Sequence, residues 1–348
     1  MNIPDDLPRS LRLRLDRAAL AANWQALNKL SGAAEAGAAV KADAYGLGVD
    51  AVVPTLRDAG ARTFFLAHWS EVPAVLRHVD GSAVSVLHGV RNAKEAAYSR
   101  AIGVVPVINS LRQAQLWQES GGGTCHVMVD SGINRLGLAP RELSDPAVRS
   151  LDIDILMSHL ASADENSPQN ARQLGVFSDV LSGVEARRHS LSNSAGIMHG
   201  ADYHFDVTRP GLALYGGIAH QALANYIAQV AYPQAAIIQI RNLSPGDAVG
   251  YNAKWVADRP TRAATVSIGY ADGFLRSMGT GGALQHGDER LKILGRVSMD
   301  MIVVDVGSSG VKEGDFLDLP FNLPEMSHRS GLSQYEILTI LGDRFDRE

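Results

Sequence analysis

Short apolar runs alternate with longer segments of helical period from about Ala38 to Gly216. Runs of this length that are rich in valine, isoleucine and leucine indicate strands buried on both faces, and nearly every gap between them is long enough for a crossover helix. The eight runs are "AAVKA", "FFLAH", "VSVLHG", "VVPVIN", "CHVMVD", "DILMSH", "RHSLSNS" and "HFDVTRP". Eight such units favour a (β/α)8 barrel over an open doubly wound sheet.

Several segments between these runs carry helix start and stop signals. Ser110 is expected to cap a helix that ends before Gly121, and Ser167 followed by Pro168 is expected to begin another. Asp50 is in position to cap a helix that ends near Gly60.

After about residue 225 the pattern changes to strands separated by tight turns such as "SPGD" and "KEGD", with helical periodicity nearly absent. The sequence therefore predicts an α/β barrel domain over residues 11–225 and a mainly β domain over residues 226–348. The extreme N-terminus, with "RLRL" in alternation, can add a strand to the second domain, so residues 1–10 are expected to pack with it.

The charge of the chain narrows the class of partner. A formal net charge of −5 and a pI near 6.1 leave no basic excess for binding nucleic acid or an anionic membrane, so a small-molecule partner is favoured. No stretch has the length of a membrane span, and the N-terminus lacks the apolar core of a signal peptide. We expect a cytoplasmic protein.

Cys125 is the only cysteine, which excludes an intrachain disulfide and a zinc site built from cysteines, and suits a reducing compartment. Its place in an apolar run predicts an inert core thiol. We expect no metal.

Polar residues at the ends of the eight runs are the candidate chemistry, because the active site of such a barrel lies at the carboxyl ends of its strands. These residues are Lys41, Arg135, His159, Asn193, Ser194 and Arg209. Each also has a structural interpretation: the lysine can extend its charge to water, the histidine can be a satisfied core residue, the serine can cap a helix, and the arginines can be ion-paired. Their convergence on one face favours a phosphorylated aldehyde cofactor bound as a Schiff base to Lys41.

In the second domain, "SIGYADGF" and "GRVSMD" are equally typical of turns between strands. From the residues alone the turn interpretation is favoured for both.

The ordered set of motifs resembles the alanine racemases, which are fold-type III pyridoxal-phosphate enzymes. The resemblance covers essentially the whole chain, through "VKADAYGLG", "DSGINRLGL", "SHLASADE", "SLSNSAG", "DVTRPGLALYGG", "GYNA", "SIGYADGF", "GRVSMDMIVVDV" and "YEILT". It implies that Lys41 carries pyridoxal 5'-phosphate and is one of two catalytic bases, and that Tyr270, from the partner subunit of a homodimer, is the other. Racemisation needs an acid on each face of a planar intermediate.

The resemblance also implies roles for other residues. Arg209 faces the pyridine nitrogen, to which a guanidinium donates a hydrogen bond but no proton, and His159 orients Arg209 and Tyr270. The phosphate is bound by the hydroxyls of Tyr45, Ser194 and Tyr335 and the backbone N–H groups of Ser194, Gly211 and Leu212. The substrate carboxylate is met by Arg135 and the backbone at Met299. Residues lining the entrance are Asp164, Tyr251 and Arg296.

Two positions depart from the family pattern. Many members have, seven residues before the arginine of "NRLG", a lysine that becomes carbamylated and positions that arginine; here the residue is Met128, so we expect no carbamate. Either a bound anion or Asn134 orients Arg135 instead, or its role is weakened. Ser298 replaces a common cysteine, and this near-isosteric change is expected to matter little.

Three alternatives remain beside interconversion of L- and D-alanine. A racemase of broader amino-acid specificity has the same motifs, because one methylene changes binding by only about 1–3 kcal/mol. A fold-type III decarboxylase is disfavoured by "GYADG" and by Arg209, where decarboxylases typically have a carboxylate. A non-catalytic pyridoxal-phosphate-binding protein keeps the lysine and the phosphate site, but such proteins lack the β domain. The motifs do not separate D-alanine supply for peptidoglycan from alanine catabolism.

Overall fold

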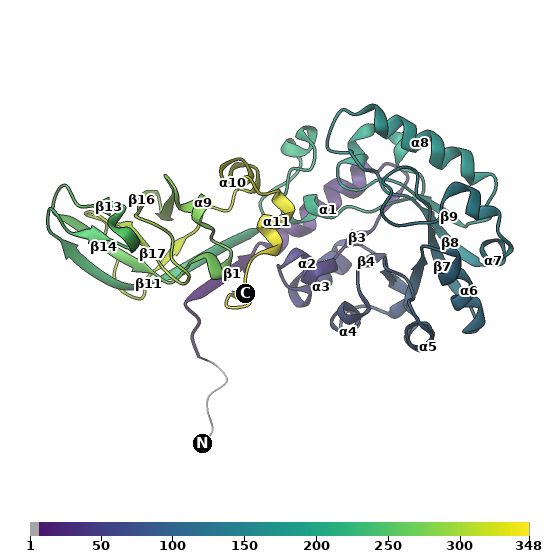
Figure 1. The fold of residues 1–348 in the computed structure, drawn as a ribbon, viewed down its shortest axis with the longest axis horizontal. Helices are drawn as coiled ribbons and strands as arrows, with labels where there is room; N and C mark the ends of the chain where they lie inside the picture. Colours follow the sequence, from purple (N-terminus) through teal and green to yellow (C-terminus); the bar gives the residue numbers. More distant parts are fainter. Residues whose placement is uncertain (1–6, 348) are drawn as a thin grey trace, which may run out of the picture. The chain divides into compact units, whose positions relative to one another are not determined.

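The computed structural model of the protein describes residues 7–347 (Figure 1). The chain folds into two compact units: Arg17–Ala228 forms one, and the residues up to Asp16 with those from Gln229 onward form the other. The sequence-based boundaries, at residue 11 and after residue 225, differ from these by a few residues. The first differs because the alternating strand β1 (Leu11–Leu15) buries its leucines in the β unit and pairs there. Residues 1–6, named in the expectation for the N-terminus, lie outside the described part.

The first unit contains a closed parallel barrel. Seven strands hydrogen-bond in chain order: β3 (Ala38–Ala39), β4 (Phe64–Leu66), β5 (Val84–Val86), β6 (Val105–Ile108), β7 (Thr124–Met128), β8 (Asp152–Met157) and β9 (Arg188–Ser190). The eighth, β10 (Val207–Thr208), pairs in parallel with β2 (Glu35–Ala36), which leads directly into β3. On its other side β10 is joined to the β9 segment by bonds from Asp206 N to His189 O (3.0 Å) and from Arg209 N to Ser192 O (2.8 Å). The eight predicted strands and the (β/α)8 barrel are confirmed.

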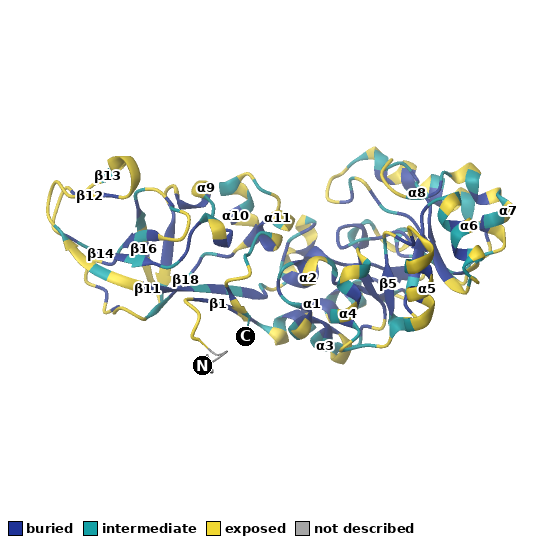
Figure 2. Ribbon diagram, turned by 60° about the horizontal axis from the view of Figure 1, so that its bottom comes forward, coloured by how far each residue is buried: buried dark blue, intermediate teal, exposed yellow. Residues whose placement is uncertain are grey.

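Most barrel strands are apolar on both faces because the interior and the outer layer of helices each cover one side. Phe64, Phe65 and Leu66 of β4 are all buried, and Figure 2 shows the same for neighbouring strands. Cys125 is buried among them, so the prediction of a core position is confirmed. Burial raises the pKa of its thiol to about 12, as expected of an unreactive thiol.

Helices follow most of the barrel strands. These helices are α3 (Val49–Ala59), α4 (Val72–Val75), α5 (Ala93–Ile102), α6 (Leu111–Glu119), α7 (Pro146–Arg149) and α8 (Pro168–Leu181). A further helix, α1 (Arg17–Leu30), precedes the first strand. Between β9 and β10 the chain makes only 3-10 turns, Gly196–His199 and Ala201–Tyr203, where a crossover helix would be usual.

Two of the three predicted helix caps are confirmed. The hydroxyls of Ser110 and Ser167 accept hydrogen bonds from the first turns of α6 and α8. The prediction for Asp50 is wrong, because α3 begins after Gly48 and the Asp50 carboxylate binds the side chains of Arg77 and His78. A tertiary ion pair has here replaced a local cap.

The second unit is a mainly antiparallel sheet that closes on itself. Its strands, besides β1, are β11 (Ala231–Leu243), β14 (Thr261–Val266), β15 (Ala283–His286), β16 (Glu289–Leu294), β17 (Ile302–Asp305), β18 (Phe316–Asp318) and β19 (Asp346–Arg347), with a separate hairpin of β12 (Ala248–Val249) and β13 (Trp255–Val256). Closure depends on β11, whose first half pairs with β1 and β18 and whose second half pairs with β14. An irregularity between Ile237 and Gln239 lets one long strand serve both sides. The prediction of a mainly β second domain is confirmed.

This unit also contains three short helices: α9 (Arg276–Gly279), α10 (Leu323–Ser330) and α11 (Gln334–Thr339). They are too short to show periodicity, but α11 has a local signal, since Ser333 and Glu336 form a capping box. Among the described residues, no helix is both long and apolar enough to cross a membrane.

Candidate active site

Lys41 stands directly after the first barrel strand, at the carboxyl end where such barrels hold their active sites. It begins α2 (Lys41–Tyr45), which is a left-handed turn: φ is 54°, 51° and 53° at Ala42, Asp43 and Ala44. L-residues pay about 1–2 kcal/mol each for this conformation, so surrounding contacts must hold it. One such contact is the Asp43 carboxylate, which accepts the Val49 N–H at 2.8 Å and ties the turn to α3.

The surroundings of Lys41 favour its neutral amine. Burial lowers the pKa of Lys41, and the positive charges of Arg135 and Arg209 lower it further, while Glu71 opposes the shift. A neutral amine is the nucleophile that adds to an aldehyde, so this lysine is suited to form a Schiff base.

A cluster of hydroxyl and backbone N–H groups from Tyr45, Ser194, Gly211 and Leu212, here called the cradle, lies beside the turn. The hydroxyl oxygen of Ser194 accepts the N–H groups of Gly211 (2.9 Å) and Ala213 (3.3 Å). Leu212, between Gly211 and Ala213 in the sequence, is buried, and its N–H has no acceptor within residues 7–347. Tyr45 completes the cradle, because a Cβ atom on Gly211 would lie 2.3 Å from its hydroxyl oxygen. The side chain of Ser194 serves this cradle instead of capping the turn at Gly196–His199, which has no side-chain cap.

Arg209 is buried at the carboxyl end of β10, and no carboxylate among residues 7–347 binds it. Its guanidinium donates to the hydroxyl of Ser190 and to the backbone carbonyl of Ser158. Burial lowers the pKa of Arg209 to about 10, so it remains a cation at neutral pH. The ion-paired interpretation of Arg209 is therefore wrong.

His159 follows β8 next to Ser158. Burial, with the charges of Arg209, Arg135 and Lys41, lowers the pKa of His159 to about 3. The imidazole is accordingly neutral at physiological pH and can both donate and accept a hydrogen bond. The lysine, both arginines and this histidine thus act on one another electrostatically at the barrel mouth.

Arg135 lies on a loop that the Asp130 carboxylate shapes by accepting the N–H groups of Gly132, Ile133 and Asn134 (2.8–3.1 Å). Asn134 has a positive φ of 56° and does not bind Arg135. Within the described residues no hydrogen bond or ion pair holds the Arg135 guanidinium, so the expected role for Asn134 finds no contact here. Met128 is buried, and its Cγ would lie 3.0 Å from a Cβ on Gly137. Asp164 is exposed on the loop before α8.

The other predicted site residues belong to the β unit. Tyr270 opens a 3-10 turn, Tyr270–Asp272, whose backbone pairs with the "GRVSMD" segment: Tyr270 N donates to Ser298 O (3.1 Å) and Ala271 N to Met299 O (3.0 Å). The buried Asp272 carboxylate accepts the Gly269 N–H (3.0 Å) and binds Arg344 (2.6 Å). The segment is therefore a turn, as its residues predicted, and its backbone bonds also hold Tyr270 next to Met299.

The remaining predicted residues of the β unit are exposed. Tyr251 and Arg296 lie on its surface, and Tyr335 is at the start of α11. The predicted site residues are thus divided between the two units, with Tyr251, Tyr270, Arg296, Met299 and Tyr335 in the β unit.

Residues that the sequence did not single out also build the site. Tyr215 stacks on Tyr45 with ring centroids 4.7 Å apart and donates its hydroxyl to Ala39 O at 2.7 Å. Glu71 faces the Lys41 turn. Glu71 follows the second predicted strand as Lys41 follows the first, so an extended search of strand ends would have found it.

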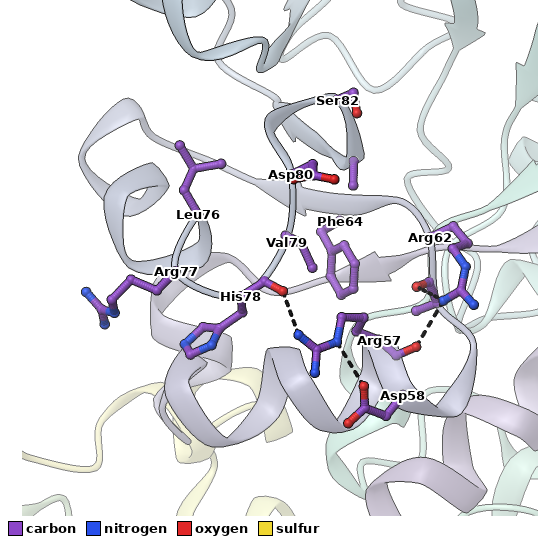
Figure 3. Close-up of a pocket in the computed structure, with 12 residues that line it drawn as sticks. Arg57, Asp58, Arg62, Phe64, Leu76, Arg77, His78, Val79, Asp80 and Ser82 are labelled. Carbon is purple, nitrogen blue, oxygen red and sulfur yellow. Dashed lines mark hydrogen bonds and ion pairs between the residues drawn. The ribbon is translucent and has the colours of Figure 1, made fainter.

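A groove of about 680 Å³ lies elsewhere on the barrel (Figure 3). Its lining includes Phe64, where β4 begins, and Ala83, just before β5, so it belongs to the amino ends of the strands. Arg57 is paired with Asp58, and Arg77 with Asp50. These paired charges and this location separate the groove from the site at Lys41.

Among the described residues, no group of three histidine, cysteine, aspartate or glutamate side chains is placed to bind a metal ion. A closed barrel with a buried lysine of lowered pKa beside the cradle, followed by a β unit, defines the barrel class of pyridoxal-phosphate enzymes.

Comparison with known proteins identifies the family. Residues 15–219 match the profile of the alanine racemase N-terminal domain, and residues 230–348 match that of the alanine racemase C-terminal domain. The chain belongs to the alanine racemase family.

Similarity to individual proteins supports the same family. The chain is 41% identical to a biosynthetic alanine racemase of Agrobacterium fabrum, over 97% of this chain and 93% of that protein. It is 38% identical to a catabolic alanine racemase of the same organism, over 96% of this chain and 91% of that protein. The structure resembles an alanine racemase of Bartonella henselae with covalently bound pyridoxal phosphate, with a TM-score of 0.88, 32% identity and coverage of 98% and 99% of the two chains.

Proposed function

We propose that the protein is a pyridoxal-phosphate-dependent racemase that interconverts L-alanine and D-alanine, using Lys41 of one subunit and Tyr270 of the partner subunit as opposed bases. The single observation that carries this proposal is the arrangement at the barrel mouth. A lysine with a lowered pKa lies next to the cradle of Tyr45, Ser194 and Gly211, and a buried cation, Arg209, has no carboxylate partner in the part of the chain that the structure describes.

The residues of the cradle fit the phosphate of the cofactor. The buried Leu212 N–H has no protein acceptor, and the Gly211 N–H is satisfied only by the Ser194 hydroxyl. Phosphate oxygens would accept these N–H groups and the hydroxyls of Ser194 and Tyr45, with Ser194 N–H and the Tyr335 hydroxyl completing the set. Lys41 would attach the cofactor covalently.

When bound, the cofactor supplies an electron sink for the negative charge left on the substrate Cα. Lys41 takes or returns the proton on one face, for which its lowered pKa is suited. Tyr270 does so on the other face. Its position is held by the bonds of its turn to Ser298 and Met299.

Arg209 and His159 set the protonation around the cofactor ring. With a pKa of about 10, the Arg209 guanidinium would donate a hydrogen bond to the pyridine nitrogen of the bound cofactor without transferring its proton. This weakens the electron sink and limits side reactions such as transamination. His159, neutral at physiological pH, orients Arg209 and Tyr270 without adding a second cation.

Substrate recognition is assigned to Arg135 and the backbone at Met299, with Asp164, Tyr251 and Arg296 at the entrance. The Arg135 guanidinium has no protein partner in the described chain and so remains available for a substrate carboxylate. Its positive charge acts on Lys41, which places it electrostatically near the reacting nitrogen.

A homodimer follows from the two-base mechanism and from the exposure of the β unit. Met299, Tyr335 and Tyr251 are 53%, 45% and 67% exposed on this chain, which is unusual for large apolar and aromatic side chains in a site. A partner subunit that covers them would complete both sites at once. We also propose a cytoplasmic location, for which the single cysteine is suited, and supply of D-alanine for peptidoglycan.

The test is loss of optical rotation when L-alanine is mixed with the purified holoprotein. Lys41→Ala and Tyr270→Phe should each abolish it, while the visible absorbance of the bound cofactor survives in Tyr270→Phe. A persistent absorbance with no racemisation by the wild type would favour a non-catalytic binding protein. Equal rates with L-serine would favour the racemase of broader specificity.

Subunit sharing is tested by mixing the two inactive variants after reversible dissociation. A mixed dimer has one site with an intact Lys41 and an intact Tyr270, so statistical mixing should restore about a quarter of the wild-type activity. No recovery from properly mixed dimers would mean that each chain completes its own site.

A further inference from the structure

One carboxylate links the first two barrel strands at the nucleophile. Glu71 Oε1 accepts the N–H of Ala42, the residue after Lys41, at 2.5 Å. Its Oε2 accepts the N–H groups of Ala67 (2.8 Å) and His68 (2.9 Å), the two residues that follow β4. The bond to His68 closes a local capping box, but the bond to Ala42 is 29 residues distant in sequence and has no part in capping.

The turn that Glu71 holds is unfavourable by itself. Ala42, Asp43 and Ala44 are consecutive left-handed residues, none of them glycine. Such a conformation persists only where its surroundings determine it, and it clusters at functional sites. Glu71 binds the N–H of Ala42, the first of these three residues, and the carboxylate of Asp43, the second, binds the first N–H of α3.

Glu71 also differs in charge from the other groups around Lys41. Of the charged side chains that shift the pKa of Lys41, Arg135 and Arg209 are cations and Glu71 is the anion. Two histidines are affected by Lys41 as well: His159, and His88, whose ring contacts that of His68 edge-on at 4.3 Å. Burial and the neighbouring His68 lower the pKa of His88, which disfavours a further cation beside Lys41 at neutral pH.

We infer that Glu71 is a positioning residue for Lys41. Its carboxylate locks the left-handed turn that sets the place of the Lys41 amine, and it supplies the negative charge that offsets Arg135 and Arg209. The contacts stand by themselves, whereas their meaning for catalysis rests on the proposed function of Lys41.

Glu71→Gln tests the charge in the full-length holoprotein. The side chain keeps its size but loses the negative charge and one acceptor. The nitrogen that joins Lys41 to the cofactor should then lose its proton more readily. Its titration, followed by the visible absorbance of the bound cofactor, should shift down by about 0.5–1 pH unit. We expect kcat to fall about tenfold with little change in KM.

Glu142→Gln is the matched control, because Glu142 closes a capping box at Ala139 (2.7 Å) in the same barrel and, within residues 7–347, makes no hydrogen bond or ion pair with the Lys41 turn. It should leave the titration midpoint and kcat at wild-type values. Identical midpoints and kcat values for Glu71→Gln and Glu142→Gln would overturn the inference.

Glu71→Asp separates charge from reach and also serves if Glu71→Gln fails to fold. It keeps the negative charge but is one methylene too short to bind both strand ends, so kcat should fall while the midpoint stays near that of the wild type. Wild-type kcat in this variant would refute a positioning role. The absorbance titration needs no racemisation, so a wild type that binds cofactor but does not act on alanine would refute the proposed function alone.

Discussion

The hydroxyl of Tyr45 lies against the Cα of Gly211, where a Cβ atom would be only 2.3 Å from its oxygen. These two residues come from opposite ends of the barrel sequence, after the first strand and after the last. Their contact leaves the Gly211 N–H facing Ser194 and forms one wall of the proposed phosphate cradle. Only a residue without a side chain allows this approach.

Gly211→Ala is therefore expected to displace Tyr45 and weaken cofactor binding. Overpacking of this kind costs about 1–3 kcal/mol, which corresponds to a loss of about 5- to 150-fold in affinity, measured by titrating the unloaded protein with pyridoxal phosphate. The matched control is Gly175→Ala within α8, where no atom lies within 4 Å of the new Cβ. It should raise the free energy of unfolding by about 0.5–1 kcal/mol and leave cofactor affinity unchanged. Equal affinities for the two variants would contradict the cradle.

Protonation of His126 is expected to make the barrel sensitive to acid. Its ring is buried, Nδ1 accepts the Ile155 N–H at 3.1 Å, and Nε2 lies 2.9 Å from the Ser85 hydroxyl. Burial lowers the pKa of His126 to about 4, although Asp154 opposes the shift. In the unfolded chain this histidine binds a proton below about pH 6.5, whereas in the folded chain it does so only below about pH 4. The free energy of unfolding therefore falls as the pH decreases from about 6.5 to about 4.

Urea unfolding at pH 7 and pH 5 measures this effect. The free energy of unfolding should fall by about 1.4 kcal/mol per pH unit below the unfolded pKa for this histidine. His159, whose pKa is also lowered, adds a similar slope. His126→Asn should remove the contribution of His126, and a wild-type pH dependence in that variant would show that its ring is not the source.

Asp272→Asn is expected to reduce turnover more than cofactor binding. The Asp272 carboxylate is 1% exposed, accepts the Gly269 N–H and binds Arg344, so it holds the turn that carries Tyr270. Loss of its charge should lower kcat about tenfold and the free energy of unfolding by about 1–3 kcal/mol. Cofactor absorbance should be retained, because the lysine and the cradle belong to the other unit.

Asp300→Asn is the control, since Asp300 also binds Arg344 (2.8 Å) but is exposed. It should change both quantities little. A kcat as low as that of Asp272→Asn would assign the effect to Arg344 instead of to the Tyr270 turn.

Because residue 128 is a methionine, we expect that activity does not depend on dissolved carbon dioxide. No lysine stands there to be carbamylated, so thorough degassing should leave kcat unchanged. Met128→Lys should place an ammonium group at a position that is 6% exposed, destabilising the barrel by several kcal/mol or lowering the pKa of the new lysine. Carbon-dioxide-dependent activity in the wild type would contradict the expectation.

Local signals in the sequence were sufficient for much of the fold. Most of the eight barrel strands were predictable because they are apolar on both faces, and the caps at Ser110 and Ser167 because a serine needs only its own next turn to bond. The cap at Asp50 failed because Arg77 and His78, distant in sequence, bind the same carboxylate. The double pairing of β11 likewise depends on strands before and far after it.

By itself, the sequence determined the barrel, the β domain and the order of the family motifs, since apolar periodicity and motif spacing are properties of the chain. The bonds of the candidate residues depend on the tertiary structure: Ser194 accepts the Gly211 N–H instead of capping a helix, Arg209 is buried with no carboxylate partner among residues 7–347, and Glu71 accepts the N–H of Ala42, next to Lys41. Hydrogen bonds and charge interactions act over a few ångströms in space, whatever the separation along the chain. They exist only after the barrel closes and brings its strand ends together.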